Sequence, residues 1–178
     1  MDQKGRKMTK KKSKAKTMPM RALEGRGIPY EPRQQTHKQH TAEGVAEDLG
    51  ISVAQVLKAM IVQRSGPQRA RRSSPFVLIV VPGDRRLSLK KVGATLGDKN
   101  VKFASERDVQ RVTGFQVGAV SVLGFRRADV PSYVDQRVLE LDQVVISAGR
   151  PDVGLALAST DLVKAMDGAQ LGDYCEDE

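Results

Sequence analysis

Residues 76–81 read FVLIVV and are followed at once by a Pro-Gly pair. An apolar run of this length, bounded by turn residues, is typical of a strand buried on both faces. Further along, Ser88 and Ser105 each precede a segment with apolar residues at helical spacing, and these segments end at Gly97 and Gly114. The stretch therefore predicts a buried strand followed by two short, capped helices.

The elements on either side of this strand do not alternate regularly. Before it we expect a helix from about Met18, a polar loop over 31–40, a helix from Thr41 to Gly50 and a strand over 57–63, with a basic loop at 64–75. After the two helices we expect strands at 101–104, around Tyr133, near Leu139, at 143–149 and at 154–158, and a last helix capped by Thr160. This order predicts an α+β fold, with a mixed or antiparallel sheet packed by helices.

Composition excludes several classes of protein. The 178 residues suit one domain, and no apolar run approaches the ~20 residues that span a bilayer. The basic start is not followed by an apolar segment, so no secretory signal is expected. The single cysteine, Cys175, excludes an intrachain disulfide, which favours a cytoplasmic location. It lies in the sequence GDYCEDE, which we interpret as an exposed acidic tail with an inert thiol.

Positive charge is concentrated at the N-terminus. The net charge is +9, and residues 1–16 carry eight basic residues and one acidic residue, or +7, so the other 162 residues sum to +2. We expect a disordered basic tail over 1–17, a domain over 18–168 and an acidic tail over 169–178. The basic tail either binds a nucleic acid or only aids solubility. The candidate contacts with a nucleic-acid backbone are Lys10, Lys11 and Lys12 in the tail, and Arg71 and Arg72 in the 64–75 loop.

The inventory of catalytic residues is sparse. The only histidines, His37 and His40, lie in the polar loop, and we expect neither to be catalytic. No P-loop, dinucleotide fingerprint or GxSxG motif is present, and the chain lacks a set of metal ligands. We therefore expect no cofactor and no metal, and any chemistry has to proceed without a triad, a metal or a thiol.

Three features remain as candidates. Lys58 is the only charged residue between Asp48 and Arg64, and taken alone it reads more readily as a solvent-exposed lysine than as a cleft residue. The glycine-rich stretch GFQVGAVSVLGF at 114–125 either brings backbone N–H groups close to a ligand or forms ordinary turns. The stretch ISAGRPDVGLALASTDL at 146–162 either lines a pocket or forms a tight hairpin.

Together these features resemble the YbaK/EbsC-type family of free-standing aminoacyl-tRNA deacylases, which is related to the editing domain of bacterial prolyl-tRNA synthetases. The matching segments begin at residues 21, 41, 76 and 144, and they read RALEGRGIPYE, TAEGVAEDLGISVAQVLKAMIV, the whole of 76–125, and VVISAGRPDVGLALASTDLVKAM. Each segment is loose by itself, but their order and spacing are specific.

The resemblance implies a mixed sheet, partly closed into an open barrel and wrapped by helices. It implies hydrolysis in trans of mischarged tRNA, with Cys-tRNA(Pro) or an ester of a similar small amino acid as substrate. tRNA is then a partner and prolyl-tRNA synthetase a candidate partner, while the oligomeric state is left open. Lys58 occupies the place of the family's essential lysine, and Gly118 lies in the loop that holds the scissile carbonyl. The residues implied to bind the substrate are Met60, Gly114, Ser121, Gly124, Ser147 and Gly149.

Two positions depart from the family pattern. The glycine loop of the family reads GxxxGxxSPxG, and here Val122 stands where the proline is expected. Gly154 stands where some cysteine-specific members carry an acidic residue, although Asp152 is near. The identity of the amino acid removed is therefore open. The alternative function is a non-catalytic module of the same fold that binds RNA or the ribosome.

Overall fold

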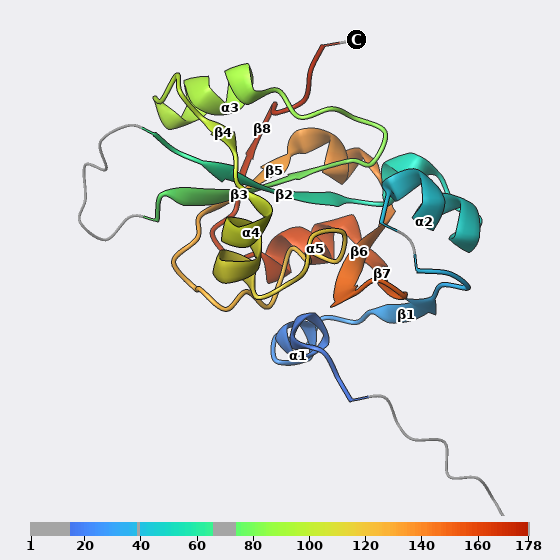
Figure 1. Ribbon diagram of the computed structural model, residues 1–178. Helices are drawn as coiled ribbons and strands as arrows, with labels where there is room; N and C mark the ends of the chain where they lie inside the picture. Colours follow the sequence, from blue (N-terminus) through green and yellow to red (C-terminus); the bar gives the residue numbers. More distant parts are fainter. Residues whose placement is uncertain (1–14, 39, 66–73, 178) are drawn as a thin grey trace, which may run out of the picture.

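The computed structural model describes residues 15–38, 40–65 and 74–177, and it consists of two β-sheets with helices packed around them (Figure 1). The prediction of an α+β fold with a mixed sheet is confirmed, because antiparallel and parallel strand pairs both occur. The candidate tRNA contacts Lys10, Lys11, Lys12, Arg71 and Arg72 lie outside the described residues.

The larger sheet is built around the FVLIVV strand. Its order is β4-β2-β3-β5-β8, with bounds β2 Lys58–Gln63, β3 Phe76–Val81, β4 Lys102–Phe103, β5 Ser132–Asp135 and β8 Gln170–Gly172. Every residue of β3 is buried. The reason is that β3 lies between two neighbouring strands and is covered by a separate hydrophobic cluster on each face, so alternate residues enter different cores.

The smaller sheet has the order β1-β7-β6, with β1 Glu31–Gln34, β6 Gln143–Arg150 and β7 Val153–Ala158. The prediction of a loop over 31–40 is wrong at its start, because residues 31–34 form strand β1. That strand is polar and contains Pro32 because it is the exposed edge of the sheet, where one side of the backbone needs no strand partner. The two sheets are joined where the Leu57 N–H donates to the carbonyl of Val145, at a distance of 2.9 Å.

Three of the described helices begin at the predicted capping residues. The bounds of the helices are α1 Met18–Glu24, α2 Ala42–Leu49, α3 Leu89–Leu96, α4 Glu106–Thr113 and α5 Ser159–Ala165, with short 3₁₀ turns at Val53–Gln55 and Gln136–Glu140. The side chains of Thr41, Ser88 and Ser105 each accept a hydrogen bond from the first turn, as predicted. None of the described helices has the length and apolar character that a membrane crossing requires.

Two local predictions near the C-terminal half are wrong. The strand expected near Leu139 is a 3₁₀ turn, because the carboxylate of Asp135 accepts the N–H of Arg137 and starts a helical turn there. The last helix begins at Ser159 with Ala158 as its N-cap, so Thr160 does not cap it. The β7 strand runs directly into α5, which leaves no room for a separate capping residue.

The prediction of an exposed acidic tail is also wrong. Residues 170–172 form β8, which pairs in parallel with β5, and Tyr174 and Cys175 are buried beside α3 in the second hydrophobic cluster. Asp135 holds this segment by accepting the Tyr174 N–H at 2.8 Å. Burial raises the pKa of Asp135, but the hydrogen bonds from Tyr174, Arg137 and Cys175 together outweigh that effect and leave the pKa below its ordinary value.

Cys175 is expected to be unreactive in the folded protein because burial, and then its hydrogen bond to Asp135, raise the pKa of the thiol to about 12. At pH 8 the thiolate fraction is on the order of 10³-fold below that of an ordinary cysteine. Titration with DTNB should show negligible reaction in buffer and complete reaction after unfolding in urea. Comparable rates in the two states would contradict the burial of this side chain.

Candidate active site

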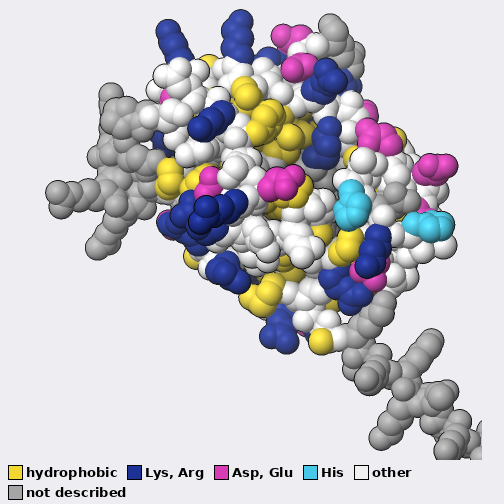
Figure 2. Space-filling view, viewed as in Figure 1, with side chains coloured by type: hydrophobic (Ala, Val, Ile, Leu, Met, Phe, Trp, Pro, Cys, Tyr) yellow, Lys and Arg dark blue, Asp and Glu magenta, His cyan; other side chains and the backbone are white. Residues whose placement is uncertain are grey.

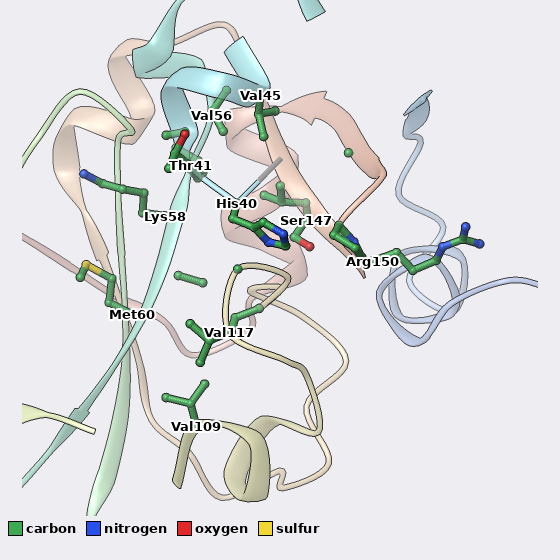
Figure 3. A pocket seen from close by; sticks show the side chains of 18 of the residues that line it. His40, Thr41, Val45, Val56, Lys58, Met60, Val109, Val117, Ser147 and Arg150 are labelled. Atoms are coloured by element: carbon green, nitrogen blue, oxygen red, sulfur yellow. The ribbon is translucent and has the colours of Figure 1, made fainter. Parts of the chain in front are cut away.

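A cavity of about 400 Å³ opens at the edge of β2, between α2, the glycine-rich loop and the β6–β7 hairpin (Figure 3). Its walls are mainly aliphatic: Val45, Val56, Leu57, Ala59, Ile61, Val109, Val120, Val145, Ile146 and Val153. Four residues singled out from the sequence line it together, namely Lys58, Met60, Gly118 and Ser147. The volume is typical of a small-molecule pocket.

Lys58 is the first residue of β2 and lies opposite Val81 of β3. Its ammonium group donates a hydrogen bond to the carbonyl of Arg85, in the turn that follows β3. Figure 3 shows this side chain directed away from His40 and Ser147. The cavity therefore has a positive charge on one side, separated from the glycine loop on the other. Lys58 therefore lines a cleft. From the residues alone this was the less favoured of the two interpretations.

Gly118 stands at the turn of the glycine-rich loop with a φ of +86°, a conformation that favours glycine. A Cβ atom built there would lie 2.6 Å from Nδ1 of His40, so the loop and the imidazole are in close contact. The next N–H, that of Ala119, donates to the carbonyl of Gln116 at 3.0 Å. Among the described residues, the N–H of Gly118 takes part in no backbone hydrogen bond, which leaves it free for a ligand.

Ser147 fastens the hairpin to the glycine loop. Its hydroxyl donates to the carbonyl of Ala119 at 3.0 Å and accepts the N–H of Gly149 at 3.1 Å. The hydroxyl proton is therefore engaged by a backbone carbonyl and is not shared with an imidazole. Ser147 holds the loop that carries Gly118, and it is not arranged as an activated nucleophile.

The other predicted substrate-binding residues do not line the cavity. Gly114 ends α4 with a φ of +82°, and the hydroxyl of Ser121 is buried within its own loop, 3.5 Å from the N–H of Leu123. Gly124 and Gly149 are close-packing positions, because a Cβ atom would lie 2.8 Å from the backbone of Met18 and 2.6 Å from the ring of Phe115, respectively. These four residues have structural roles in the described part of the chain and are absent from the cavity lining.

Sequence reasoning missed several residues of the cavity. His40 precedes α2 and stands over Gly118, and Thr41, the cap of α2, also lines the space. Arg150 lines it from the hairpin, with its guanidinium held by Asp152 at 2.8 Å. The only sequence feature that could have indicated His40 is its position next to Thr41, the cap of α2. That position does not predict the contact of His40 with the glycine-rich loop.

The site offers charge and backbone donors but no metal centre. In the described part of the chain, no three His, Cys, Asp or Glu side chains gather as metal ligands. A lysine ammonium, a free N–H at a glycine turn and apolar walls can orient a polar substrate and stabilise an oxyanion.

Known proteins of similar sequence and structure show the same domain. The model of the aminoacyl-tRNA editing domain matches residues 36–165. EbsC from Enterococcus faecalis, whose name proposes it as a Cys-tRNA(Pro)/Cys-tRNA(Cys) deacylase, is 28% identical over 165 residues, which are 90% of this chain and 94% of EbsC. A proline–tRNA ligase from Methylobacillus flagellatus is 32% identical over 133 residues, which are 74% of this chain but only 22% of the ligase.

A solved structure, described as a proposed trans-editing enzyme for prolyl tRNA synthetase, superposes with a TM-score of 0.78 at 26% identity, and covers 90% of this chain and 96% of the other. The region matched by the family model contains strands β2 to β7 and the residues that line the cavity from His40 to Gly154. This protein therefore belongs to the aminoacyl-tRNA editing domain family.

Proposed function

We propose that this protein is an aminoacyl-tRNA deacylase that acts in trans and removes a small, wrongly attached amino acid, with Cys-tRNA(Pro) as the first substrate to test. The observation that carries the proposal is the meeting of Lys58, the free N–H of Gly118 and apolar walls in one cavity. The name of EbsC and the match to part of a proline–tRNA ligase support the choice of tRNA(Pro).

The chemistry needs no enzyme nucleophile. An aminoacyl ester lies next to a free ribose hydroxyl, and binding can place a water molecule held by that hydroxyl, or the substrate's own thiol, against the carbonyl carbon. The N–H of Gly118 stabilises the negative charge that develops on the carbonyl oxygen. Lys58 supplies the positive charge that holds the terminal phosphate or the aminoacyl end in place. Attack by water forms a new bond from its oxygen to the carbonyl carbon, the ester bond to the ribose oxygen breaks, and the proton lost by the water passes to that ribose oxygen. The products are the free amino acid and the tRNA; attack by the thiol would release the amino acid as a cyclic thioester, with the thiol proton passing to the same oxygen.

Selection by size is built into the same cavity. Met60, Gly118 and Ser147 all line this cavity. We expect its limited volume to admit a small amino-acid side chain and to exclude a large one, as in a second-sieve site. Because Gly154 lines the cavity without a side chain, the wall there carries no carboxylate that could bind a particular amino acid.

The basic N-terminal segment is proposed to bind the tRNA backbone, together with the arginines of the 64–75 loop. If about four of its charges meet phosphates, deleting residues 1–16 should flatten the log–log salt dependence of tRNA affinity by roughly 3 units. A fourfold rise in salt would then cost the full-length protein about 60-fold more affinity than the truncated one. The saturated rate should not change, because uniform binding leaves the chemical barrier as it was. Equal salt slopes for the two forms would exclude this role.

The decisive experiment is a deacylation panel. Purified protein is mixed with tRNA(Pro) carrying cysteine, alanine, serine or proline, and loss of the ester is followed over time. We expect rapid loss of at least one small non-cognate ester and no loss of the proline ester. If every ester is stable while the tRNA still binds, the protein is a non-catalytic RNA-binding module and the proposal fails.

A further inference from the structure

Phe103 is an exposed aromatic ring in a chain that has few of them. The sequence contains four Phe, three Tyr and no Trp. Most described rings are engaged, as Phe115 with Phe125, Tyr133 with Tyr174, Phe76 beneath Arg111, and Tyr30 through its hydroxyl to Glu24. Phe103 takes part in none of these contacts, and 47% of its surface is exposed. It also lines the cavity described above.

The position of Phe103 relates it to Lys58. Phe103 lies on the edge strand β4 directly opposite Val62 of β2, so its side chain emerges on the same face as Val62, Met60 and Lys58. Four residues along a strand separate Lys58 from the level of Phe103, or about 13 Å. The lysine and the aromatic ring both line the cavity, the lysine from one end of β2 and the ring from β4 beside the other end of β2.

The surroundings of the ring suit a nucleotide. Val117, which is 50% exposed, adds apolar surface at the cavity. Lys102 precedes the ring, and Arg107 lies in the first turn of α4; both are exposed. Figure 2 shows hydrophobic side chains gathered on the face that carries the two histidines, with both Lys and Arg and Asp and Glu side chains around them. Glu106, beside Arg107, also lines the cavity, so the border of the ring is of mixed charge with cations on it. An apolar platform with cations nearby is a usual arrangement for a single-stranded nucleic acid.

We propose that Phe103 is the platform on which the 3′-terminal adenine of the aminoacyl-tRNA stacks while the ester lies in the cavity. This inference rests on the proposed function. The adenine and the ester are attached to the same ribose, so an ester in the cavity forces the base to its mouth. Stacking there buries the exposed ring, and the nearby cations meet the phosphates that precede the terminal nucleoside.

Two other arrangements are possible outcomes of the test. The imidazole of His40 also lies at the cavity, but it already contacts Gly118. The edge strand β4 offers its free side to a second copy of the chain. A base is favoured over a second copy because this strand is only two residues long and one of the two is Lys102, a charged residue of the kind that disfavours pairing between sheet edges.

The test uses tRNA whose terminal adenine is replaced by the fluorescent base 2-aminopurine, which is quenched on stacking. Binding to the full chain should quench the signal. Phe103→Ala should abolish the quench and weaken tRNA binding by about 5- to 150-fold, whereas Phe103→Tyr should restore both. Leu171→Ala, at an exposed apolar residue on the other edge of the sheet, is the matched control and should leave both unchanged.

The outcomes separate this inference from the proposed function. An active wild-type protein whose quench survives in Phe103→Ala, or is lost only in His40→Ala, overturns the platform and leaves the deacylase proposal intact. A change of oligomeric state in Phe103→Ala with the quench retained assigns the ring to a dimer contact and also overturns it. If the wild type hydrolyses no ester but its quench depends on Phe103, the platform stands and the deacylase proposal fails. If the alanine variant is unstable, Phe103→Leu replaces it in the test, because leucine keeps apolar volume without the aromatic ring. This variant should also lose the fluorescence quench.

Discussion

Replacing Lys58 with alanine is expected to lower the single-turnover rate of deacylation by about 10²–10³-fold. The ammonium group is the positive charge that the cavity presents on the β2 side, and its loss leaves the anionic end of the substrate without a partner. The free energy of unfolding should fall by only about 0.5–1.5 kcal/mol, which corresponds to the hydrogen bond to the Arg85 carbonyl. Rates at saturating enzyme and a urea titration measure the two effects separately.

Three variants make this prediction specific. Lys58→Met keeps the aliphatic stem without the charge and should be as slow as the alanine variant. Lys58→Arg should recover little, because a planar guanidinium does not replace a compact ammonium group in a confined site. Lys164→Ala removes an exposed lysine of α5 that pairs with Asp161 outside the cavity, and it should keep the wild-type rate. Wild-type activity in Lys58→Ala would remove this residue from the mechanism.

A single methyl group at Gly118 is expected to reduce deacylation by about 10²-fold or more while the protein remains folded. The added Cβ would lie 2.6 Å from Nδ1 and 3.3 Å from Cβ of His40, so either the imidazole or the loop has to move. Moving the loop displaces the N–H that stabilises the oxyanion. The positive φ adds roughly 1–2 kcal/mol of backbone strain to the folded state.

Gly114→Ala is the matched control, because it separates strain from displacement of the loop. Its φ is +82°, close to that of Gly118, but a Cβ there would meet its nearest neighbour, Arg126, at 3.6 Å. It also lies outside the cavity lining. We expect a similar loss of stability in the two variants by urea titration and a large loss of rate only in Gly118→Ala. Equal rate losses would show that the glycine loop has only a structural role.

Local signals in the sequence were sufficient for most of the framework. A helix cap or a fully apolar strand depends on residues only a few positions apart, so it can be predicted from a short stretch of sequence. This explains the correct predictions of the caps at Thr41, Ser88 and Ser105 and of the buried strand over 76–81. Local signals failed where distant contacts outweighed them. The polar β1 became a strand through pairing with β7, and β8 through pairing with β5.

The candidate site shows the same division. The family resemblance indicated Lys58, Met60, Gly118 and Ser147, and all four line one cavity. The same resemblance also indicated Gly124 and Gly149, which pack closely against α1 and Phe115, respectively. A glycine that approaches a ligand and a glycine that approaches another backbone look identical in a sequence, since both are selected for the missing side chain.

What the sequence by itself determined is the buried strand over 76–81, the helices capped by Thr41, Ser88 and Ser105, and the family motif with its lysine and glycines. Only the tertiary structure decided that His40 stands over Gly118, that the thiol of Cys175 is buried, and that Phe103 reaches solvent beside the cavity. Each of these depends on pairs of residues separated by tens of positions. Such pairs are brought together by the register of the sheet and by the packing of helices onto it. The periodicity of the sequence predicts individual helices and strands but does not predict which of them come into contact.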